Sequence, residues 1–437
     1  MQTIDTLIHA RWVLPIEPAN TVLEHHTVAI EGGRILALLP TSEAKTTFQA
    51  KQNFELNEHA VMPGLVNSHT HAAMSLLRGL ADDLPLMTWL EEHIWPVEGQ
   101  WVDENFVQDG TELAIAEMLR GGTTCFNDMY FFPEVTAHSA VECGMRAVVG
   151  LLMIDFPSAW GSGPEAYLQK GLAIHQQYRN SPLIHTAFAP HSPYTVSNEP
   201  LERLQVLAAE LELPIHMHIH ESAQEVSDSL KQSGLRPLER LDQLGLLGPR
   251  LAAVHMTQLI ESEIELLAAR NVSVIHCPES NMKLASGFCP VHKLMQAGVN
   301  VAVGTDGAAS NNDLDLLGEM RTASLLAKGV AGDATALTAH QSLQMATLNG
   351  ARAVGLEQEI GSLLPGKAAD LIAIDLSTLE SQPLYDVASL LAYATGRHQV
   401  QEVWVNGEHL LRQGELVTLD SEKVKRQAKQ WRGKIAP

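Results

Sequence analysis

The sequence predicts an α/β fold: a (β/α)8 TIM barrel joined to a small β-sandwich domain that both chain ends build. Two observations lead to this prediction. Between about residues 61 and 310, eight apolar runs of strand length alternate with helical patterns, and eight such units make a barrel of roughly 250 residues. The rest of the 437-residue chain is β-rich at both ends. We therefore expect a composite β domain over residues 1–58 and 366–437, and the barrel over residues 59–365.

Turn signals separate strand-like runs at both ends of the chain. The runs are residues 5–14, 27–31 and 34–38 at one end, and residues 369–375 and 402–405 at the other. Gly32-Gly33 predicts a turn, and Asn406-Gly407 is a strong hairpin signal. We expect these runs to pair into one domain, with the barrel inserted between them.

Polar residues with versatile chemistry mark the ends of several predicted barrel strands. The eight strands are Val61–Val66, Thr123–Asn127, Arg146–Leu152, Leu183–Ala189, Pro214–His218, Leu251–His255, Val272–His276 and Asn300–Gly304. The residues at or just after their ends are His69, His71, His191, His218, His255 and Asp306. Because the carboxyl ends of TIM-barrel strands form the active-site face, this regularity predicts a metal site there.

Composition narrows the functional class. The formal net charge is −22 with no basic block to offset it, which disfavours nucleic acid and anionic membranes as partners. The four cysteines form no Cys-X-X-Cys pair, so neither a disulfide framework nor a thiolate zinc site is indicated. No signal peptide is recognisable and no apolar run is long enough to span a bilayer. We expect a cytoplasmic enzyme.

The His69-Thr70-His71 motif is the first candidate metal-binding element. In a strand, side chains at positions i and i+2 point to the same face, so both imidazoles would project together. Neutral imidazoles are good zinc ligands. Taken alone, the pair also fits ordinary core or surface histidines, and only the candidate ligands downstream favour a metal.

Motifs in order along nearly the whole chain carry a family resemblance. They are Pro63 to His71, Leu76-Leu77-Arg78-Gly79, Gly121-Gly122-Thr123-Thr124, Pro190 to Tyr194, His218 to Glu221, His276 to Leu284, Gly304 to Asn312 and Gly366 to Leu371. With these motifs the chain resembles the amidohydrolase superfamily, and within it the methylthioadenosine/S-adenosylhomocysteine deaminase (chlorohydrolase-like) branch.

The resemblance implies one divalent metal ion, zinc or iron, held by four side chains: His69, His71, His218 and Asp306. Three imidazoles and a carboxylate leave a position for water, whose pKa zinc lowers to roughly 7. Relatives with two metals use a lysine at the end of the fourth strand, and Leu183 to Pro190 contains none. His216, His218 and His220 alternate, so all three could face the same way. The resemblance selects His218, because Glu221 follows it.

The same resemblance implies hydrolytic deamination at C6 of an adenine nucleoside, with release of ammonia. Glu221 would be the catalytic acid and base, Asp306 would also accept the proton of the attacking water, and His255 would polarise the developing oxygen. Glu98 and His191, with Glu221 and Asp306, would bind the substrate. From the residues alone, His255 also fits a core histidine, Glu98 a surface carboxylate, and the apolar Leu84 to Trp101 either core packing or a pocket wall.

The nature of the substrate is the most open of these expectations. Relatives that accept adenosylhomocysteine place arginines after the third strand, and residues 147–178 contain none. This favours methylthioadenosine, while adenosylhomocysteine, 5′-deoxyadenosine and adenosine remain candidates. The alternatives are deamination of guanine, 8-oxoguanine or cytosine, dechlorination of a triazine, or a catalytically inactive barrel scaffold. A homodimer or higher homo-oligomer is a family expectation.

Overall fold

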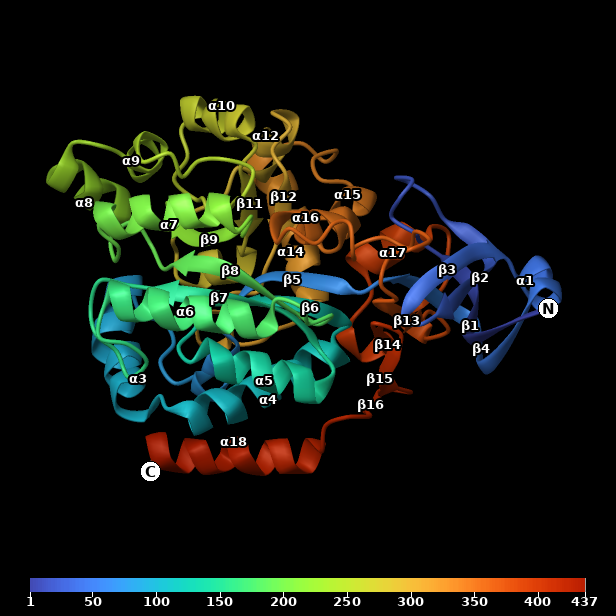
Figure 1. Cartoon of the computed structure of the whole chain (residues 1–437). Helices are drawn as coiled ribbons and strands as arrows, with labels where there is room; N and C mark the ends of the chain where they lie inside the picture. The colour runs from blue at the N-terminus through green and yellow to red at the C-terminus, as the bar shows by residue number, and fades with distance from the viewer. Residues whose placement is uncertain (437) are drawn as a thin grey trace.

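The computed structural model describes residues 1–436 and contains two sheets of eight strands each. Figure 1 shows a barrel surrounded by helices and a smaller β region beside it, in which the blue N-terminal and red C-terminal segments lie together. The predicted fold class, a TIM barrel plus a sheet from both chain ends, is confirmed.

All pairings in the barrel sheet are parallel, and its strands follow one another in chain order. The strands are β5 (Leu65–Thr70), β6 (Thr123–Asp128), β7 (Arg146–Met153), β8 (Ile184–Pro190), β9 (Ile215–Ile219), β10 (Leu251–His255), β11 (Ser273–His276) and β12 (Val301–Val303). The first and last strands meet where Asp306 N–H donates to the His69 carbonyl at 3.0 Å. This contact brings candidate residues 237 positions apart in the chain side by side.

Helices cover the outside of the barrel. They are α4 (Glu104–Arg120), α5 (Pro133–Cys143), α6 (Pro164–Tyr178), α7 (Asn198–Glu210), α8 (Ala223–Ser233), α9 (Pro237–Gln243), α10 (Glu261–Arg270), α11 (Pro278–Lys283), α12 (Val291–Gln296), α13 (Ala308–Asn311), α14 (Leu316–Ala331), α15 (Ala339–Met345) and α16 (Leu348–Ala353). Between β5 and α4 lie a 3-10 helix (Ala72–Leu77), α2 (Leu86–Thr88), a π-helical segment (Trp89–Ile94) and α3 (Trp95–Trp101).

The second sheet has the strand order β16-β15-β14-β13-β4-β1-β2-β3, so the C-terminal strands form one half, the N-terminal strands form the other, and the halves join where β13 pairs with β4. Its strands are β1 (Gln2–Val13), β2 (Leu23–Glu31), β3 (Arg34–Pro40), β4 (Phe48–Pro63), β13 (Leu371–Asp375), β14 (Val400–Val405), β15 (Glu408–Arg412) and β16 (Glu415–Leu416). A short helix, α1 (Thr41–Thr47), joins β3 to β4. Ile8, Val28 and Trp404 belong to one buried apolar cluster of this sheet.

Seven of the eight predicted barrel strands match the observed strands to within one residue at each end. The prediction of Val61–Val66 as the first strand was wrong. Residues 61–63 end β4 in the second sheet, and β5 starts at Leu65. Gly64 separates the two strands where the backbone passes Thr124: a Cβ at Gly64 would lie 2.0 Å from the Thr124 hydroxyl oxygen. β4 therefore crosses the predicted domain boundary at residue 58.

The C-terminal segment does not belong to the second sheet throughout. Helix α17 (Val387–Tyr393) packs against α14 and α15, and helix α18 (Ser421–Ile435) packs against α4, as Figure 1 shows for α18. The Trp431 ring meets Phe106 edge to face at 5.2 Å, and its Nε1–H donates to Asp109 at 2.7 Å. Residues 421–435 thus cover a barrel helix, although the sequence placed them in the β domain.

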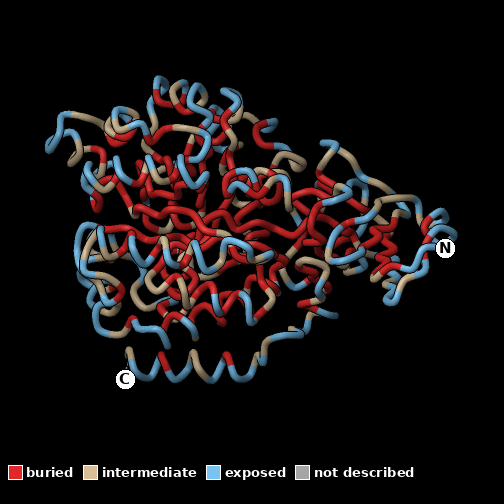
Figure 2. Tube along the Cα trace, viewed as in Figure 1, coloured by how far each residue is buried: buried red, intermediate tan, exposed pale blue. Residues whose placement is uncertain are grey.

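Buried residues run continuously from the barrel into the second sheet, as the red trace in Figure 2 shows. A buried ion pair lies at this junction. The Arg146 guanidinium, at the start of β7, donates to both Asp370 carboxylate oxygens at 2.7 and 3.0 Å, and to the Pro182 carbonyl at 2.6 Å. This bidentate pair fixes the second sheet to the amino-terminal end of the barrel.

Candidate metal centre and substrate pocket

The predicted site residues lie at the carboxyl ends of the barrel strands, where the backbone is strained. His220, His255 and Asp306 follow or end β9, β10 and β12 with φ values of 54°, 75° and 62°. Residues other than glycine rarely adopt such left-handed backbone conformations. Where they do, the residues are often at functional sites. The turns direct the chain away from the barrel immediately after residues that face its mouth.

The hydrogen bonds of two histidines fix which ring nitrogen carries the proton. His71 Nδ1 lies 2.5 Å from the Met129 carbonyl, and His218 Nδ1 lies 2.8 Å from the His191 carbonyl. A carbonyl only accepts, so Nδ1 is protonated in both rings. His69 Nδ1 lies 2.8 Å from His216 Nε2, and either ring can be the donor in this contact. The neutral rings of His71 and His218 therefore have the Nε2 lone pair available, as does His69 when it donates to His216.

Two of these Nε2 atoms face Asp306, and the third lies beside them. His69 Nε2 and His71 Nε2 each lie 3.3 Å from Asp306 Oδ1, and His218 Nε2 lies 3.2 Å from His69 Nε2. Lone pairs and a carboxylate facing one another at such distances repel unless a cation lies among them. Three imidazoles and one carboxylate are also the donor set that zinc prefers. The cluster is therefore suited to hold a metal ion.

Burial and the charge of Asp306 shift the pKa values of these histidines in opposite directions. Burial lowers the pKa of His69 to about 4 and holds that of His218 well below its ordinary value, so both rings are neutral at pH 7. For His71, burial is opposed by the hydrogen bond and charge of Asp306, which raise its pKa to about 9. The His71–Asp306 contact thus attracts a positive charge, which a metal ion would supply in place of the proton.

Two overlapping triads have ligand atoms within 4.8 Å of one another: His69 with His71 and Asp306, and His69 with His218 and His255. The four predicted ligands are all present in these triads. His255 is near enough to join them, but its Nδ1 donates to Asn281 Oδ1 at 2.9 Å and its Nε2 lies 3.9 Å from Glu221 Oε1. Distance alone does not separate a ligand role for His255 from a catalytic one.

Asp306 is held by hydrogen bonds from neighbouring elements. Ser280 Oγ–H donates to Oδ2 at 2.6 Å, and Gly307 N–H donates to Oδ1 at 2.8 Å. Thr70 Oγ–H donates to the Asp306 carbonyl at 3.0 Å. These contacts fix the carboxylate orientation, so one oxygen faces the histidines while the other accepts from Ser280.

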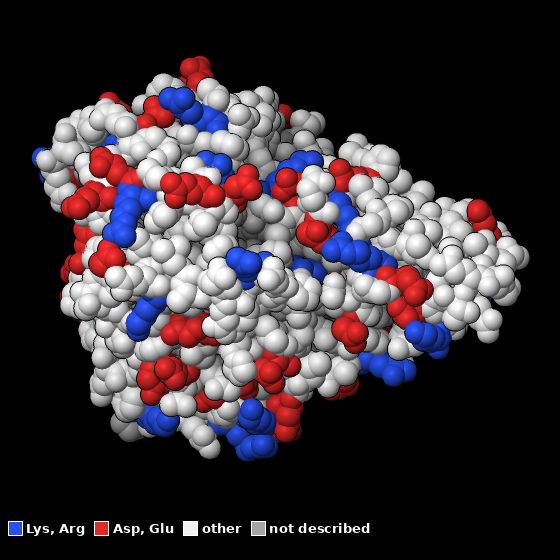
Figure 3. All heavy atoms as spheres, in the orientation of Figure 1, with Lys and Arg blue, Asp and Glu red and all other residues white. Residues whose placement is uncertain are grey.

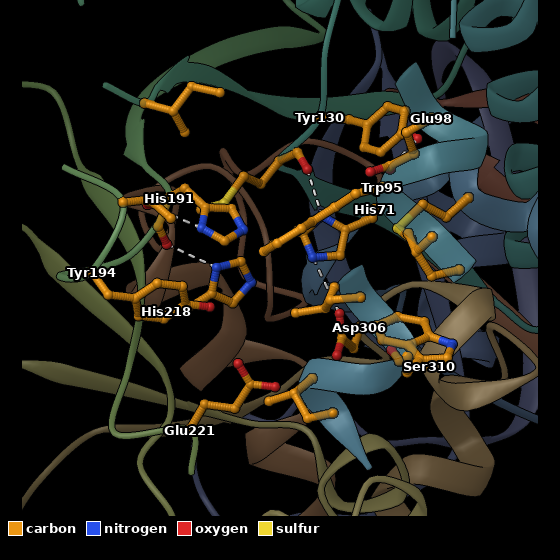
Figure 4. Close-up of a pocket in the computed structure, with 18 of the residues that line it drawn as sticks. His71, Trp95, Glu98, Tyr130, His191, Tyr194, His218, Glu221, Asp306 and Ser310 are labelled. Atoms are coloured by element: carbon orange, nitrogen blue, oxygen red, sulfur yellow. Dashed lines mark hydrogen bonds and ion pairs between the residues drawn. The ribbon is translucent and has the colours of Figure 1, made fainter. Parts of the chain in front are cut away.

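A cavity of about 460 Å³ opens above this cluster. Figure 4 shows His71, His191, His218, Glu221 and Asp306 grouped within it, with Glu98, Trp95 and Tyr130 on one side and Tyr194 on the other. Its walls are largely apolar and include Leu86, Met87, Trp89, Leu90, Ile94, Trp95, Ile154 and Phe156. The apolar segment from residue 84 to 101 therefore does form a pocket wall.

The acidic side chains that line this cavity, among the described residues, are Glu98, Glu221 and Asp306. Neither lysine nor arginine lines it in this part of the chain. Asp155 and Glu165 do not line it either. Asp155 accepts from Ser197 N–H at 2.9 Å, and Glu165 pairs with Arg203 at the surface.

Two carboxyl groups of the pocket have raised pKa values. Burial raises the pKa of Glu221 and raises that of Glu98 to about 7, although Tyr130 donates its hydroxyl to Glu98 Oε1 at 2.6 Å. His191 lies with its ring 4.8 Å from that of His218, and burial lowers its pKa to about 3. The pocket thus contains a neutral imidazole and carboxyl groups that exchange protons more readily near neutral pH than exposed ones.

The structure brings every predicted site residue to this one cavity or the cluster directly beneath it, and their roles stay predictions. It also adds residues that sequence reasoning missed. Ser280 and Asn281 lie within a motif that the resemblance used, so their position next to Asp306 and His255 was foreseeable. Tyr130 follows β6 and carried no signal, because its contact with Glu98 depends on how α3 folds over the barrel.

Comparison with known proteins gives a consistent result. The model of the amidohydrolase family matches residues 60–410. The chain is 54% identical over 431 residues to a 5-methylthioadenosine/S-adenosylhomocysteine deaminase of Saccharophagus degradans, covering 99% of this chain and 97% of that protein. It is 50% identical to the protein of the same name from Teredinibacter turnerae, covering 99% and 98%.

Solved structures extend the comparison. A zinc-bound adenosine deaminase from Xanthomonas campestris superposes with a TM-score of 0.98 at 56% identity, covering 99% of both chains. An atrazine chlorohydrolase from Arthrobacter aurescens, also with zinc, superposes with a TM-score of 0.91 at 22% identity, covering 98% of this chain and 99% of the other. At that identity, the second likeness supports the fold alone.

Proposed function

The chain belongs to the amidohydrolase family, and from this premise we propose that it is a metal-dependent hydrolytic deaminase of adenine nucleosides, with 5′-methylthioadenosine as its preferred substrate. The observation that carries the proposal is the cluster of His69, His71, His218 and Asp306 beneath a pocket lined by apolar side chains and carboxyl groups. Relatives named for this activity, at 50–54% identity over nearly the whole chain, support it.

The metal ion would be held by His69, His71, His218 and Asp306, and we propose one zinc ion per chain. When bound, zinc supplies a water molecule acidic enough to attack at neutral pH and a positive charge for the oxygen that develops at C6. The second metal of some relatives needs a lysine at the end of the fourth strand. β8, with the sequence IHTAFAP, contains none.

Two residues of the chain transfer protons, and a third stabilises the negative charge that develops. Glu221, whose pKa burial raises, donates to N1 of the purine and so makes C6 more electrophilic. Asp306 accepts the proton of the attacking water, with its carboxylate held in place by Ser280 and Gly307. His255, oriented by Asn281, stabilises the oxygen at C6. Proton delivery to the amino group then releases ammonia and leaves a hypoxanthine product.

The pocket walls support a nucleoside with an apolar tail. Glu98 can accept from the two ribose hydroxyls, and Tyr130 fixes its orientation. His191 would contact the base or ribose. The apolar side chains between Leu86 and Trp95, with Ile154 and Phe156, suit the methylthio group, because burying apolar surface contributes about 25 cal/mol per Å².

Surface charge and helix composition bear on the partners and the location of the protein. Acidic and basic side chains are interspersed on the face that Figure 3 shows, which fits the expectation that nucleic acid is not a partner. No helix within residues 1–436 combines the length and the apolar character needed to cross a membrane. A cytoplasmic location and a homo-oligomeric state remain proposals.

A substrate panel on protein of known metal content tests the proposed function. The panel contains methylthioadenosine, adenosylhomocysteine, adenosine, 5′-deoxyadenosine, guanine, 8-oxoguanine, cytosine and a chlorotriazine, with ammonia or chloride release measured. We expect adenine nucleosides to be deaminated, with one zinc per chain by elemental analysis. Activity confined to free bases or the triazine would contradict the substrate class, and two tightly bound metals per active chain would contradict the single site.

A further inference from the structure

We propose that Glu225 is a positioning residue that holds the backbone from which Glu221 reaches into the pocket. This inference rests on the proposed function and concerns the same site. Glu225 does not line the cavity, so its effect on the reaction would pass through Glu221 rather than through a contact with the substrate.

The turn that carries Glu221 has backbone groups without partners in regular structure. β9 ends at Ile219 and α8 begins at Ala223, which leaves a tight connection between them. His220 takes the left-handed conformation, with φ of 54°. The N–H groups of His220 and Glu221 therefore belong to neither the strand nor the helix, and each needs another acceptor.

The Glu225 carboxylate supplies both acceptors. Its Oε1 accepts from His220 N–H at 3.0 Å, and its Oε2 accepts from Glu221 N–H at 2.7 Å. Burial raises the pKa of Glu225 to about 8, and the hydrogen bonds from these two N–H groups oppose that rise because they favour the ionised carboxylate. With one oxygen on each successive N–H, the side chain fixes the orientation of the peptide that joins these two residues.

The carbonyl side of the same turn is held from β10. Thr257 N–H donates to the His220 carbonyl at 2.9 Å, and Thr257 Oγ–H donates to the Glu221 carbonyl at 2.7 Å. Within residues 1–436, by contrast, the Glu221 carboxyl group itself makes no hydrogen bond and approaches His255 Nε2 only to 3.9 Å. Its position at the substrate therefore depends on the backbone that Glu225 and Thr257 hold.

A purely structural role for Glu225 is the competing explanation. Ser222 is the N-cap of α8 and accepts from Glu225 N–H at 3.3 Å, so Ser222 and Glu225 have the spacing of a capping box. If Glu225 only caps the helix, its loss should lower stability and leave turnover unchanged. Ser222→Ala is the matched control, because it removes the cap side chain and leaves the carboxylate contacts to His220 and Glu221 intact.

The experiment compares wild-type holoenzyme with Glu225→Ala, Glu225→Gln and Ser222→Ala, measuring zinc content, Tm, and kcat and KM for methylthioadenosine. We expect Glu225→Ala to keep its zinc and lose about 10- to 100-fold in kcat with KM changed by less than about threefold, since a misplaced catalytic group costs turnover. Glu225→Gln should lose less, because its amide oxygen still accepts from one N–H. Ser222→Ala should lower Tm with kcat within about twofold of wild type.

A Glu225→Ala protein with wild-type kcat and the same Tm loss as Ser222→Ala would overturn the inference. An equal kcat loss in Ser222→Ala would overturn it too, because the helix start and not the carboxylate would then be responsible. If Glu225→Ala does not fold, wild-type kcat in Glu225→Gln overturns it. If the wild-type protein has no deaminase activity, the proposed function is wrong and the inference about Glu225 is wrong with it. If the wild type is active and the Glu225 variants behave otherwise than expected, only the inference about Glu225 is wrong.

Discussion

Asp306 and Asp370 are two buried aspartates in opposite environments. Asp370, at the amino-terminal end of the barrel, receives both arms of Arg146 and the Asn406 N–H, so its charge is fully compensated by the protein. Asp306, at the carboxyl-terminal end, faces the neutral ring of His69 and the ring of His71, which has a pKa of about 9 because Asp306 attracts a positive charge there. The first site is complete within the chain, and the second is complete only with a cation. Stability and chemistry are thus separated along the barrel axis.

The largest expected effect tests the carboxyl-terminal end. Glu221→Gln should keep zinc and lose roughly 10²- to 10⁴-fold in kcat, the usual loss when a positioned acid and base is removed. Its Tm should stay close to that of the wild type, because the Glu221 side chain makes no hydrogen bond within the described chain. Steady-state kinetics and elemental analysis on one preparation check this. A variant with near-normal turnover would remove Glu221 from the mechanism.

The same comparison predicts the opposite pattern at the amino-terminal end. Arg146→Met leaves Asp370 buried without its partner, and breaking a buried pair in this way costs roughly 3–5 kcal/mol. Chemical denaturation should therefore show a large loss of stability, while kcat of the folded fraction stays near wild type. Asp370→Asn combined with Arg146→Met serves as the control and should recover part of the loss. A stability change below about 1 kcal/mol would show that the junction does not depend on this pair.

The distribution of arginines extends the comparison to the substrate. Arg146 lies at the junction, while the pocket lining among the described residues offers three carboxylates and neither lysine nor arginine. A zwitterionic 5′ tail would be desolvated there without a partner for its carboxylate. We expect kcat/KM for methylthioadenosine to exceed that for adenosylhomocysteine by at least about tenfold, equivalent to roughly 1.4 kcal/mol. Equal values would point to a basic group from outside this lining, such as a partner subunit.

The sequence was sufficient to predict which residues gather at one site when those residues lie at the ends of successive barrel strands. His69, His71, His218, His255 and Asp306 mark strand ends, and a parallel barrel must bring such ends to one face. Sequence reasoning failed where a tertiary contact decides. Val61 to Pro63 reads as part of the first barrel strand, but the strand is divided at Gly64, where the chain passes between two sheets.

The roles of Tyr130 and Glu225 were also beyond sequence reasoning, for a related reason. A tyrosine after a strand and a glutamate in a first helical turn are common, and neither pattern names an acceptor or a donor. Only the fold shows that Tyr130 reaches Glu98 across α3 and that Glu225 reaches back to the two N–H groups before its helix. Side chains that position other residues are defined by contacts rather than by spacing.

The smallest expected effect concerns Glu98, the pocket carboxyl group on α3. Burial raises its pKa to about 7, so the carboxylate predominates above that pH and the neutral acid below it. Only the carboxylate can accept strongly from both ribose hydroxyls. A hydrogen bond to a charged group exceeds a neutral one by about 1 kcal/mol, which corresponds to roughly a fivefold difference in binding.

KM for methylthioadenosine should therefore rise roughly fivefold as the pH falls through 7, while the KM of Glu98→Gln, which cannot titrate, stays flat over the same range. Adenosine and 2′-deoxyadenosine form a matched substrate pair, because the deoxy sugar lacks one of the two hydroxyls and should show a weaker pH dependence of KM. A rise of KM in Glu98→Gln as large as in wild type would assign the titration to another group. The charge of Glu98 would then make no measurable contribution to substrate binding, whereas the charge of Asp370 is paired within the protein.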